Sequence, residues 1–278
     1  MKQILLFLGL LLLFSLWSFP HHRFVETVLA RPLTPLGLRV AVAKVGYAFP
    51  LGYRLGGVRL SKAQANLSVE SITLQPSLRH GLDLSARACS GTIDGSLSRR
   101  RVVLRFSGLD PSDCIRDGGL SLKGRFSGEL EFEKAENATR PRVPPRELAE
   151  KGRLRFQSHS GSVSGTLPAA AGKTPFSLGE WPFRDLSADA RLEAGTLRVS
   201  ELRALSQGVD WRLSDGRIPL SSAGSARLRA ELRARATDES PRAKAVFALL
   251  PKATLRSDGW RHYRVRGSLT SPTLIGLR

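Results

Sequence analysis

The side chains best suited to bind a metal or to act as catalytic nucleophiles are five histidines and two cysteines. They are His21, His22, His80, His159, His262, Cys89 and Cys114. None of them has the HExxH or CxxC spacing that brings ligands to one metal ion. His159 lies between two serines, but adjacent residues of a strand point to opposite faces, which disfavours a serine–histidine pair. The sequence therefore predicts a protein that is not an enzyme and that holds no metal or other cofactor.

The two cysteines are better suited to a structural disulfide. Cys89 and Cys114 are an even pair and enclose a loop of about 25 residues. In an oxidising compartment, closing such a loop stabilises a protein by about 3 kcal/mol, through the entropy of the unfolded chain. Two unrelated buried thiols are the alternative interpretation.

The charge balance is strongly basic. The 278 residues include 43 Lys and Arg against 24 Asp and Glu, and 34 of the basic residues are arginine. Only 7% of the residues are aromatic, and the arginines alternate along strands instead of clustering with rings, which argues against nucleic acid as a partner. Two interpretations remain open: a solvated charged face, or attraction to anionic lipid head groups or to an acidic partner.

The N-terminus contains an uncharged apolar stretch from Ile4 to Phe19. As a helix it would span about 24 Å, a little less than a bilayer core of about 30 Å. A cleaved signal peptide competes with an uncleaved anchor, but residues 17–21 offer no small-x-small cleavage site. The arginines after the stretch favour a cytosolic C-terminal part, whereas long domains are exported regardless of charge. We expect a membrane anchor over residues 1–22 and an exported domain over residues 23–278.

A two-residue alternation of apolar and polar residues begins at residue 36. It recurs in residues 82–86, 102–106, 126–132, 154–156 and 186–192. The longest example, residues 226–236, has the Ala, Leu and Arg content of a helix. A helix would spread its arginines around every side, so the period predicts a strand with one apolar and one charged face.

Glycines punctuate and repeat along these segments. Gly56–Gly57, Asp94–Gly95, Asp215–Gly216 and Asp258–Gly259 have the composition of turns. The pattern Gly-x-apolar-x-Gly-x-Leu begins at residues 91, 124 and 161, and its two glycines and two apolar residues would share one face of a strand. Chance is the alternative for this repeat, because Gly, Ser and Leu are common residues.

The expected fold is mainly β: an extended or curved antiparallel sheet of repeated hairpins with an N-terminal transmembrane helix. Prolines in residues 134–151 could divide the sheet into two halves. Short helices are expected over residues 20–31 and 241–250. Ser240 is suited to cap the second of these, and Pro241 to occupy its first position.

The order of the segments resembles the type II secretion system protein N family and, more distantly, the AsmA-like membrane-anchored β proteins. The anchor is followed by residues 36–40, by residues 50–60 and by the strands GTIDGSLS and GRFSGELEF. A helix that ends in FALLP then precedes the segment YRVRGSLTSP near the C-terminus. The resemblance extends over nearly the whole chain, and its specific feature is the order of the motifs.

The resemblance implies a single-pass protein of the inner membrane with its bulk in the periplasm. It would be a non-enzymatic accessory component of type II protein secretion that contacts other secretion components. The AsmA-like side of the resemblance implies instead a protein that binds or guides phospholipid along an apolar β groove. A lipid carrier requires a continuous accessible apolar surface, whereas a scaffold requires exposed strand edges or polar patches for its partners.

Overall fold

The computed structural model describes the chain from residue 39 to residue 277 with short gaps. The described residues are 39–48, 52–62, 65–77, 79, 81–98, 100–114, 120–134, 149–167, 176–193, 196–219, 227–268 and 271–277. The anchor predicted between Ile4 and Phe19 and the helix predicted over residues 20–31 lie outside these ranges. Among the described residues, no helix has the length and apolar character needed to cross a membrane.

The described chain is mainly β and forms one antiparallel sheet of fifteen strands. The strands are β1 (Arg39–Ala48), β2 (Gly52–Lys62), β3 (Ala65–Ser77), β4 (Gly81–Ala88), β5 (Gly91–Leu97), β6 (Arg101–Leu109), β7 (Leu120–Gly124), β8 (Phe126–Lys134), β9 (Ala149–Leu167), β10 (Phe176–Glu193), β11 (Thr196–Ser206), β12 (Val209–Pro219), β13 (Arg227–Ala236), β14 (Arg261–Ser268) and β15 (Ser271–Gly276). They follow one another in chain order, except that β7 and β8 both pair with β9. The sheet is therefore a meander of hairpins.

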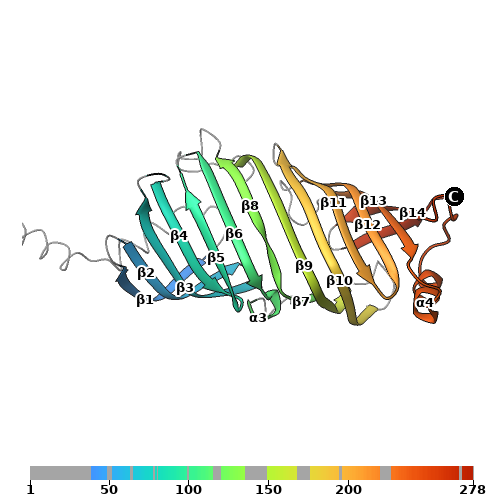
Figure 1. Ribbon diagram of the computed structural model, residues 1–278, viewed down its shortest axis with the longest axis horizontal. Helices are drawn as coiled ribbons and strands as arrows, with labels where there is room; N and C mark the ends of the chain where they lie inside the picture. The colour runs from blue at the N-terminus through green and yellow to red at the C-terminus, as the bar shows by residue number, and fades with distance from the viewer. Residues whose placement is uncertain are drawn as a thin grey trace, which may run out of the picture.

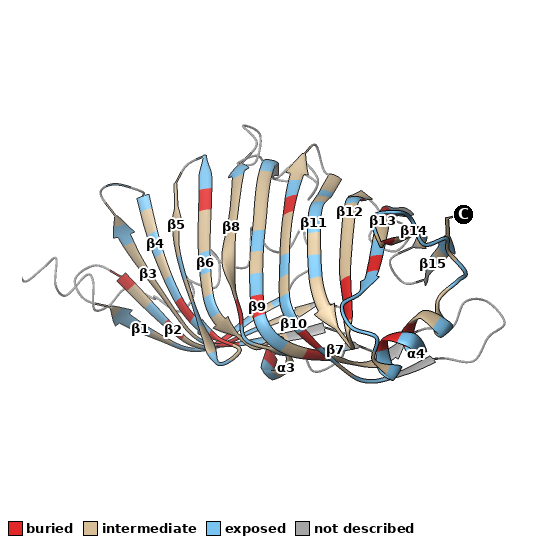
Figure 2. Cartoon of the chain, turned by 45° about the vertical axis from the view of Figure 1, so that its right-hand side comes forward, coloured by how far each residue is buried: buried red, intermediate tan, exposed pale blue. Residues whose placement is uncertain are grey.

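The sheet is elongated and curved. Figure 1 shows the strands side by side along the long axis, and their lower ends turn back behind the upper ones. Figure 2 shows the same bending from another side, most clearly in β9 and β10. These two strands are also among the longest, at 19 and 18 residues. The expectation of a curved antiparallel sheet agrees with this architecture.

Two helices are described. The first, α3 (Pro111–Cys114), is a single turn between β6 and β7 that the sequence did not predict. The second, α4 (Pro241–Leu249), lies at the C-terminal end of the sheet and confirms the helix predicted over residues 241–250 (Figure 1). It begins as expected, because the backbone N–H of Ala243 donates to the Ser240 hydroxyl at 3.2 Å.

The alternating segments predicted from the sequence are strands. Residues 227–236 form β13, so the two-residue period prevailed over helix propensity there. The turn predictions at Gly56–Gly57, Asp94–Gly95 and Asp215–Gly216 were wrong, because these pairs lie inside β2, β5 and β12. Glycine also occurs inside strands, at bulges and where another backbone or side chain lies close. The sequence alone did not distinguish such a strand glycine from a turn glycine.

Irregularities inside the strands keep the apolar residues on one side. Asp185 and Asp215 have φ values of 49° and 54° within β10 and β12. The ladders shift register beside them, between Arg184 and Ser187 and between Ser214 and Arg217. An extra residue reverses the alternation that follows it, so apolar residues three apart can share a face.

The segment predicted to divide the chain lies between β8 and β9. These two strands pair directly, with Glu133 opposite Lys151 and Leu130 opposite Leu154. The sheet thus continues from β8 to β9 without a break in pairing. Residues 135–148 lie outside the described ranges, and a boundary at 134–151 stays a prediction.

Candidate functional site

One face of the sheet is apolar across its whole width. Residues directly opposite each other on neighbouring strands share a face, so the pairing register identifies which side chains lie in line. One such line, which we call the apolar row, crosses every strand except β7. From β1 to β15 it consists of Val45, Leu55, Ile72, Ala86, Ile93, Phe106, Gly128, Phe156, Ala188, Leu202, Leu213, Leu232, Tyr263 and Gly276. With strands about 4.8 Å apart, the row is about 60 Å long.

The ends of the apolar row are covered, and its middle is partly open. Leu55 near one end and Tyr263 near the other have none of their surface exposed. Ile93, Phe106 and Phe156 in the central strands are only half-buried. Figure 2 shows the central strands mostly as intermediate or exposed, with only short buried stretches. A partly exposed apolar strip of this length is typical of a surface that binds an apolar ligand or a partner.

Glycines on the apolar face allow large side chains to lie across the strands. A Cβ atom on Gly128 would be 2.1 Å from the carbonyl oxygen of Arg155 and 2.8 Å from Cζ of Phe106. A Cβ on Gly161 would be 2.4 Å from Cζ of Phe183. Both glycines belong to the repeated Gly-x-apolar-x-Gly-x-Leu pattern. Gly128 lies in the apolar row, and Gly161 lies opposite Phe183, whose ring centroid is 6.2 Å from that of Phe126. The pattern thus serves close packing within the bent sheet.

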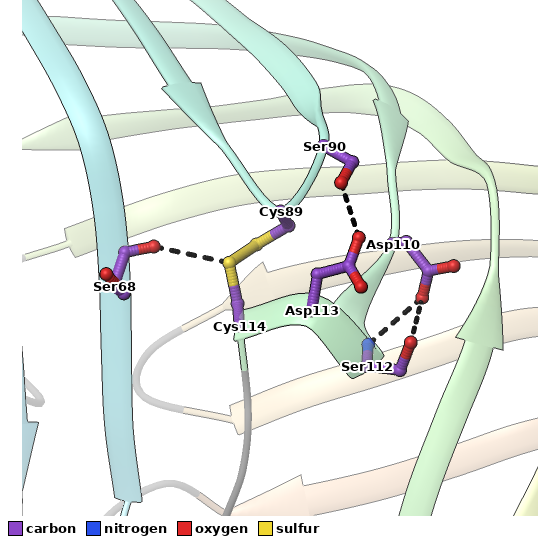
Figure 3. Close-up of a disulfide and its surroundings, with 7 residues drawn as sticks. All are labelled: Ser68, Cys89, Ser90, Asp110, Ser112, Asp113 and Cys114. Carbon is purple, nitrogen blue, oxygen red and sulfur yellow. Dashed lines mark hydrogen bonds between the residues drawn. A yellow bond between two sulfur atoms is a disulfide. The ribbon is translucent and has the colours of Figure 1, made fainter.

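A disulfide closes the N-terminal end of the apolar face (Figure 3). It joins Cys89, in the turn between β4 and β5, to Cys114 of α3, with Cα atoms 5.0 Å apart. Cys114 is buried in a core cluster with Leu55, Val58 and Val69. The cluster also includes Val42, Ala86 and Ala88, with partly buried residues of β1–β5 packed around it.

The turn that carries Cys89 has an unusual backbone. Cys89 and Ser90 have φ values of 52° and 59°, a conformation that glycine or asparagine adopts more easily. Three contacts to the α3 region hold it there: the disulfide, a hydrogen bond from the Ser90 hydroxyl to the Asp113 carboxylate, and a 2.7 Å bond from the Asp110 N–H to the Cys89 carbonyl. This turn was not predicted from the sequence, because Cys and Ser rarely adopt a positive φ and neither residue favours the conformation by itself.

Helix α4 covers the C-terminal end of the apolar face. Ala243 and Val246 of the helix are buried against Val209, Ala234 and Tyr263 of the sheet. Burial raises the pKa of the Tyr263 hydroxyl above its usual value, and the neighbouring charge of Arg261 partly offsets this effect. The apolar face therefore ends in a second core cluster.

The opposite face of the sheet, which we call the polar face, is charged. Arg101 pairs with Glu131 at 2.8 Å, and Arg153 and Arg155 both reach Asp189, at 2.6 and 3.2 Å. The hydrogen bond from Arg153, followed by that from Arg155, holds the pKa of Asp189 below its usual value despite partial burial.

The same face carries a buried carboxylate near its C-terminal end. Asp210 is 1% exposed and lies 3.3 to 3.6 Å from the guanidinium groups of Arg203, Arg212 and Arg235. Arg212 and Arg235 also lie over the ring of Trp260, with centroid distances of 4.8 and 4.6 Å. One carboxylate thus gathers three arginines into a local network.

The structure does not bring together a catalytic set in its described part. His159 is exposed and 4.0 Å from Asp185, whereas the buried Ser158 hydroxyl donates to the backbone carbonyl of Ser160 at 3.1 Å. No group of three or more His, Cys, Asp or Glu side chains that could hold a metal ion occurs among the described residues. The arrangement that is present suits binding to apolar and to charged surfaces.

The apolar row was only partly predictable. The alternation identified its members in several strands, including Phe106 and Phe156, but pairing register between strands is not encoded in local periodicity.

Comparison of the chain with protein-family models, with curated proteins and with solved structures gave no match in any of the three.

Proposed function

We propose that this chain is an envelope protein that binds the acyl chains of phospholipid along the apolar face of its sheet. It acts by binding, without catalytic turnover. The observation that supports this proposal is the apolar row itself, which runs from β1 to β15 and is partly exposed over the central strands. An acyl chain needs contact with a continuous apolar surface, because burying its methylenes contributes about 0.8 kcal/mol each.

The proposal includes a location outside the cytosol. The Cys89–Cys114 disulfide supports this location, because structural disulfides persist in oxidising compartments such as the periplasm. We propose that residues Ile4 to Phe19 hold the protein in the inner membrane as a single transmembrane helix, with the bulk of the chain in the periplasm.

Purification of the full chain from membranes, followed by native mass spectrometry, tests lipid binding. The wild-type chain is expected to retain phospholipid. The variant Leu154→Glu/Ala188→Glu adds two charges to half-buried positions of the apolar face and is expected to lose it. The control Gln157→Glu/Ser187→Glu adds the same two charges to exposed positions of the polar face in the same strands and is expected to retain lipid.

A second measurement covers the case in which the apolar-face variant fails to fold. A photoactivatable fatty acid is added to the wild-type chain, and its crosslinks are located by peptide mapping. Crosslinks at Phe106, Phe156 or Leu202 support the proposal. Wild-type protein that carries no phospholipid, or crosslinks confined to the polar face, would refute it.

A second candidate function is the accessory role in type II protein secretion that the family resemblance implies. It is favoured by the outer edge of β1, which has no strand partner among the described residues because β1 pairs only with β2. An open edge can accept a strand of another protein through backbone hydrogen bonds. Secretion components that co-purify in the absence of lipid would favour this function over lipid binding.

A further inference from the structure

The polar face of the C-terminal strands carries a line of arginines in direct cross-strand register. Its members are Arg191 of β10, Arg198 of β11, Arg217 of β12, Arg229 of β13 and Arg266 of β14. We call these five residues the arginine row. With strands about 4.8 Å apart, the row is about 19 Å long. All five side chains are exposed.

The charges of the arginine row are largely unneutralised. Arg198 has an acidic partner, Glu193, at 3.3 Å. Arg217, Arg229 and Arg266 make no ion pair or hydrogen bond with an acidic side chain in the part of the chain that the structure describes. Like charges directly opposite each other on neighbouring strands destabilise a sheet. The row therefore has a cost for the free protein that an anionic partner would remove.

Arginines elsewhere on the same face are arranged differently. Arg101 and Arg105 of β6 lie within 3.2 Å of Glu131 and Glu129 of β8, their close neighbours across the ladder. Near the C-terminal end, Asp210 gathers three arginines around one carboxylate. Several arginines of this face are thus compensated by carboxylates, whereas those of the arginine row form a continuous line of like charges in direct cross-strand register.

The row follows one rim of the sheet. Arg191, Arg217 and Arg266 each lie two residues before the end of their strand, and Arg198 and Arg229 each lie two residues after a strand begins. In an antiparallel meander these positions all lie at the same side of the sheet.

We propose that the arginine row is a docking surface for the anionic head groups of phospholipids. Guanidinium groups bind phosphate oxygens through paired, charge-assisted hydrogen bonds. Among the residues that the structure describes, no aromatic ring lies against an arginine of the row, whereas Trp260 lies against Arg212 and Arg235. The described part of the row therefore lacks the stacking platform typical of single-stranded nucleic acid sites. The row lies on the face opposite the apolar row and does not depend on acyl-chain binding.

Co-flotation with vesicles tests the proposal. The full chain is held in nanodiscs of phosphatidylcholine. The discs are then added to one of two kinds of vesicle, made either of phosphatidylcholine alone or of phosphatidylcholine with phosphatidylglycerol. We expect the discs to float with the phosphatidylglycerol vesicles at low salt, and to lose this binding at high salt. Each basic residue near an anionic membrane strengthens binding roughly fivefold, so Arg217→Gln/Arg229→Gln/Arg266→Gln should weaken it by about a hundredfold.

The control removes the same charge from the other end of the polar face. The variant Arg54→Gln/Arg59→Gln/Arg87→Gln changes three exposed arginines of β2 and β4 and is expected to bind nearly as well as the wild type. Equal losses in the two variants would overturn the proposal, because net charge alone would then explain binding. Equal binding to vesicles with and without phosphatidylglycerol would also overturn it, as would tighter binding of a single-stranded oligonucleotide than of anionic vesicles.

Discussion

The Cys89–Cys114 disulfide is expected to contribute a large part of the stability of the N-terminal core cluster. It links the β4–β5 turn to α3 and buries Cys114 beside Leu55 and Val69. The perturbation is the double variant Cys89→Ala/Cys114→Ala, or reduction of the wild-type chain. Because both act on the same bond, the two should lower the free energy of unfolding by similar amounts.

The expected magnitude has two parts. The cysteines are 25 residues apart, and opening a loop of that size stabilises the unfolded chain by about 3.5 kcal/mol. Against this, Cys89 and Ser90 have φ values of 52° and 59°, a backbone conformation that costs about 1 kcal/mol or more at a non-glycine residue and that the freed turn can relax. The net loss is therefore about 2.5 kcal/mol. With a urea dependence of about 2.5 kcal/mol per molar, the midpoint should fall by about 1 M.

The assay is urea unfolding of the full chain in a neutral detergent, followed by tryptophan fluorescence with and without reductant. The double variant serves as the control and should not respond to reductant. A midpoint that moves by less than about 0.2 M on reduction would refute the magnitude derived from chain entropy. Reaction of both cysteines with a thiol reagent in the absence of reductant would refute the bond itself.

Two further substitutions test the packing of the apolar face and the ion pairs of the polar face. Gly128→Ala places a Cβ 2.1 Å from the Arg155 carbonyl oxygen and should lower the free energy of unfolding by about 2 kcal/mol, whereas Gly179→Ala, with nothing within 4 Å, should change it little. Equal urea midpoints for the two variants would contradict this packing. Asp189→Asn removes a carboxylate whose pKa is held below its usual value by Arg153. The wild type should therefore be more stable than this variant by about 1 kcal/mol above about pH 4. This difference in the free energy of unfolding should disappear as the pH falls through the lowered pKa. An advantage that persists unchanged at about pH 2, measured by urea unfolding, would show that the ion pair is not its source.

The sequence by itself determined the type of fold and the two faces of the sheet. In residues 226–236 the two-residue alternation outweighed helix propensity, because only a strand separates the apolar residues from the arginines. Ser240 and Pro241 predicted the start of α4, since capping and the fixed φ of proline act within one turn of a helix. These signals are local, and local interactions can be recognised in a single sequence.

Only the tertiary structure decided where chain reversals and irregularities occur. Gly56–Gly57 and Asp215–Gly216 have the composition of turns but lie inside strands, whereas Cys89 and Ser90 form a turn with positive φ values that neither residue favours. The conformation at Cys89 is held by contacts to α3, more than twenty residues away in the chain. A turn conformation that depends on distant partners cannot be derived from its own residues alone.

The two rows that carry the proposals were likewise decided by tertiary structure. Phe106 and Phe156 lie in line with Gly128, and Arg217 with Arg229 and Arg266, only because each strand pairs with its neighbours in one particular register. Alternation assigns a residue to a face but not to a position along it, and a shift of two residues preserves the face while changing every cross-strand neighbour. The composition of each face was therefore fixed by periodicity, and the alignment of its side chains by pairing between strands.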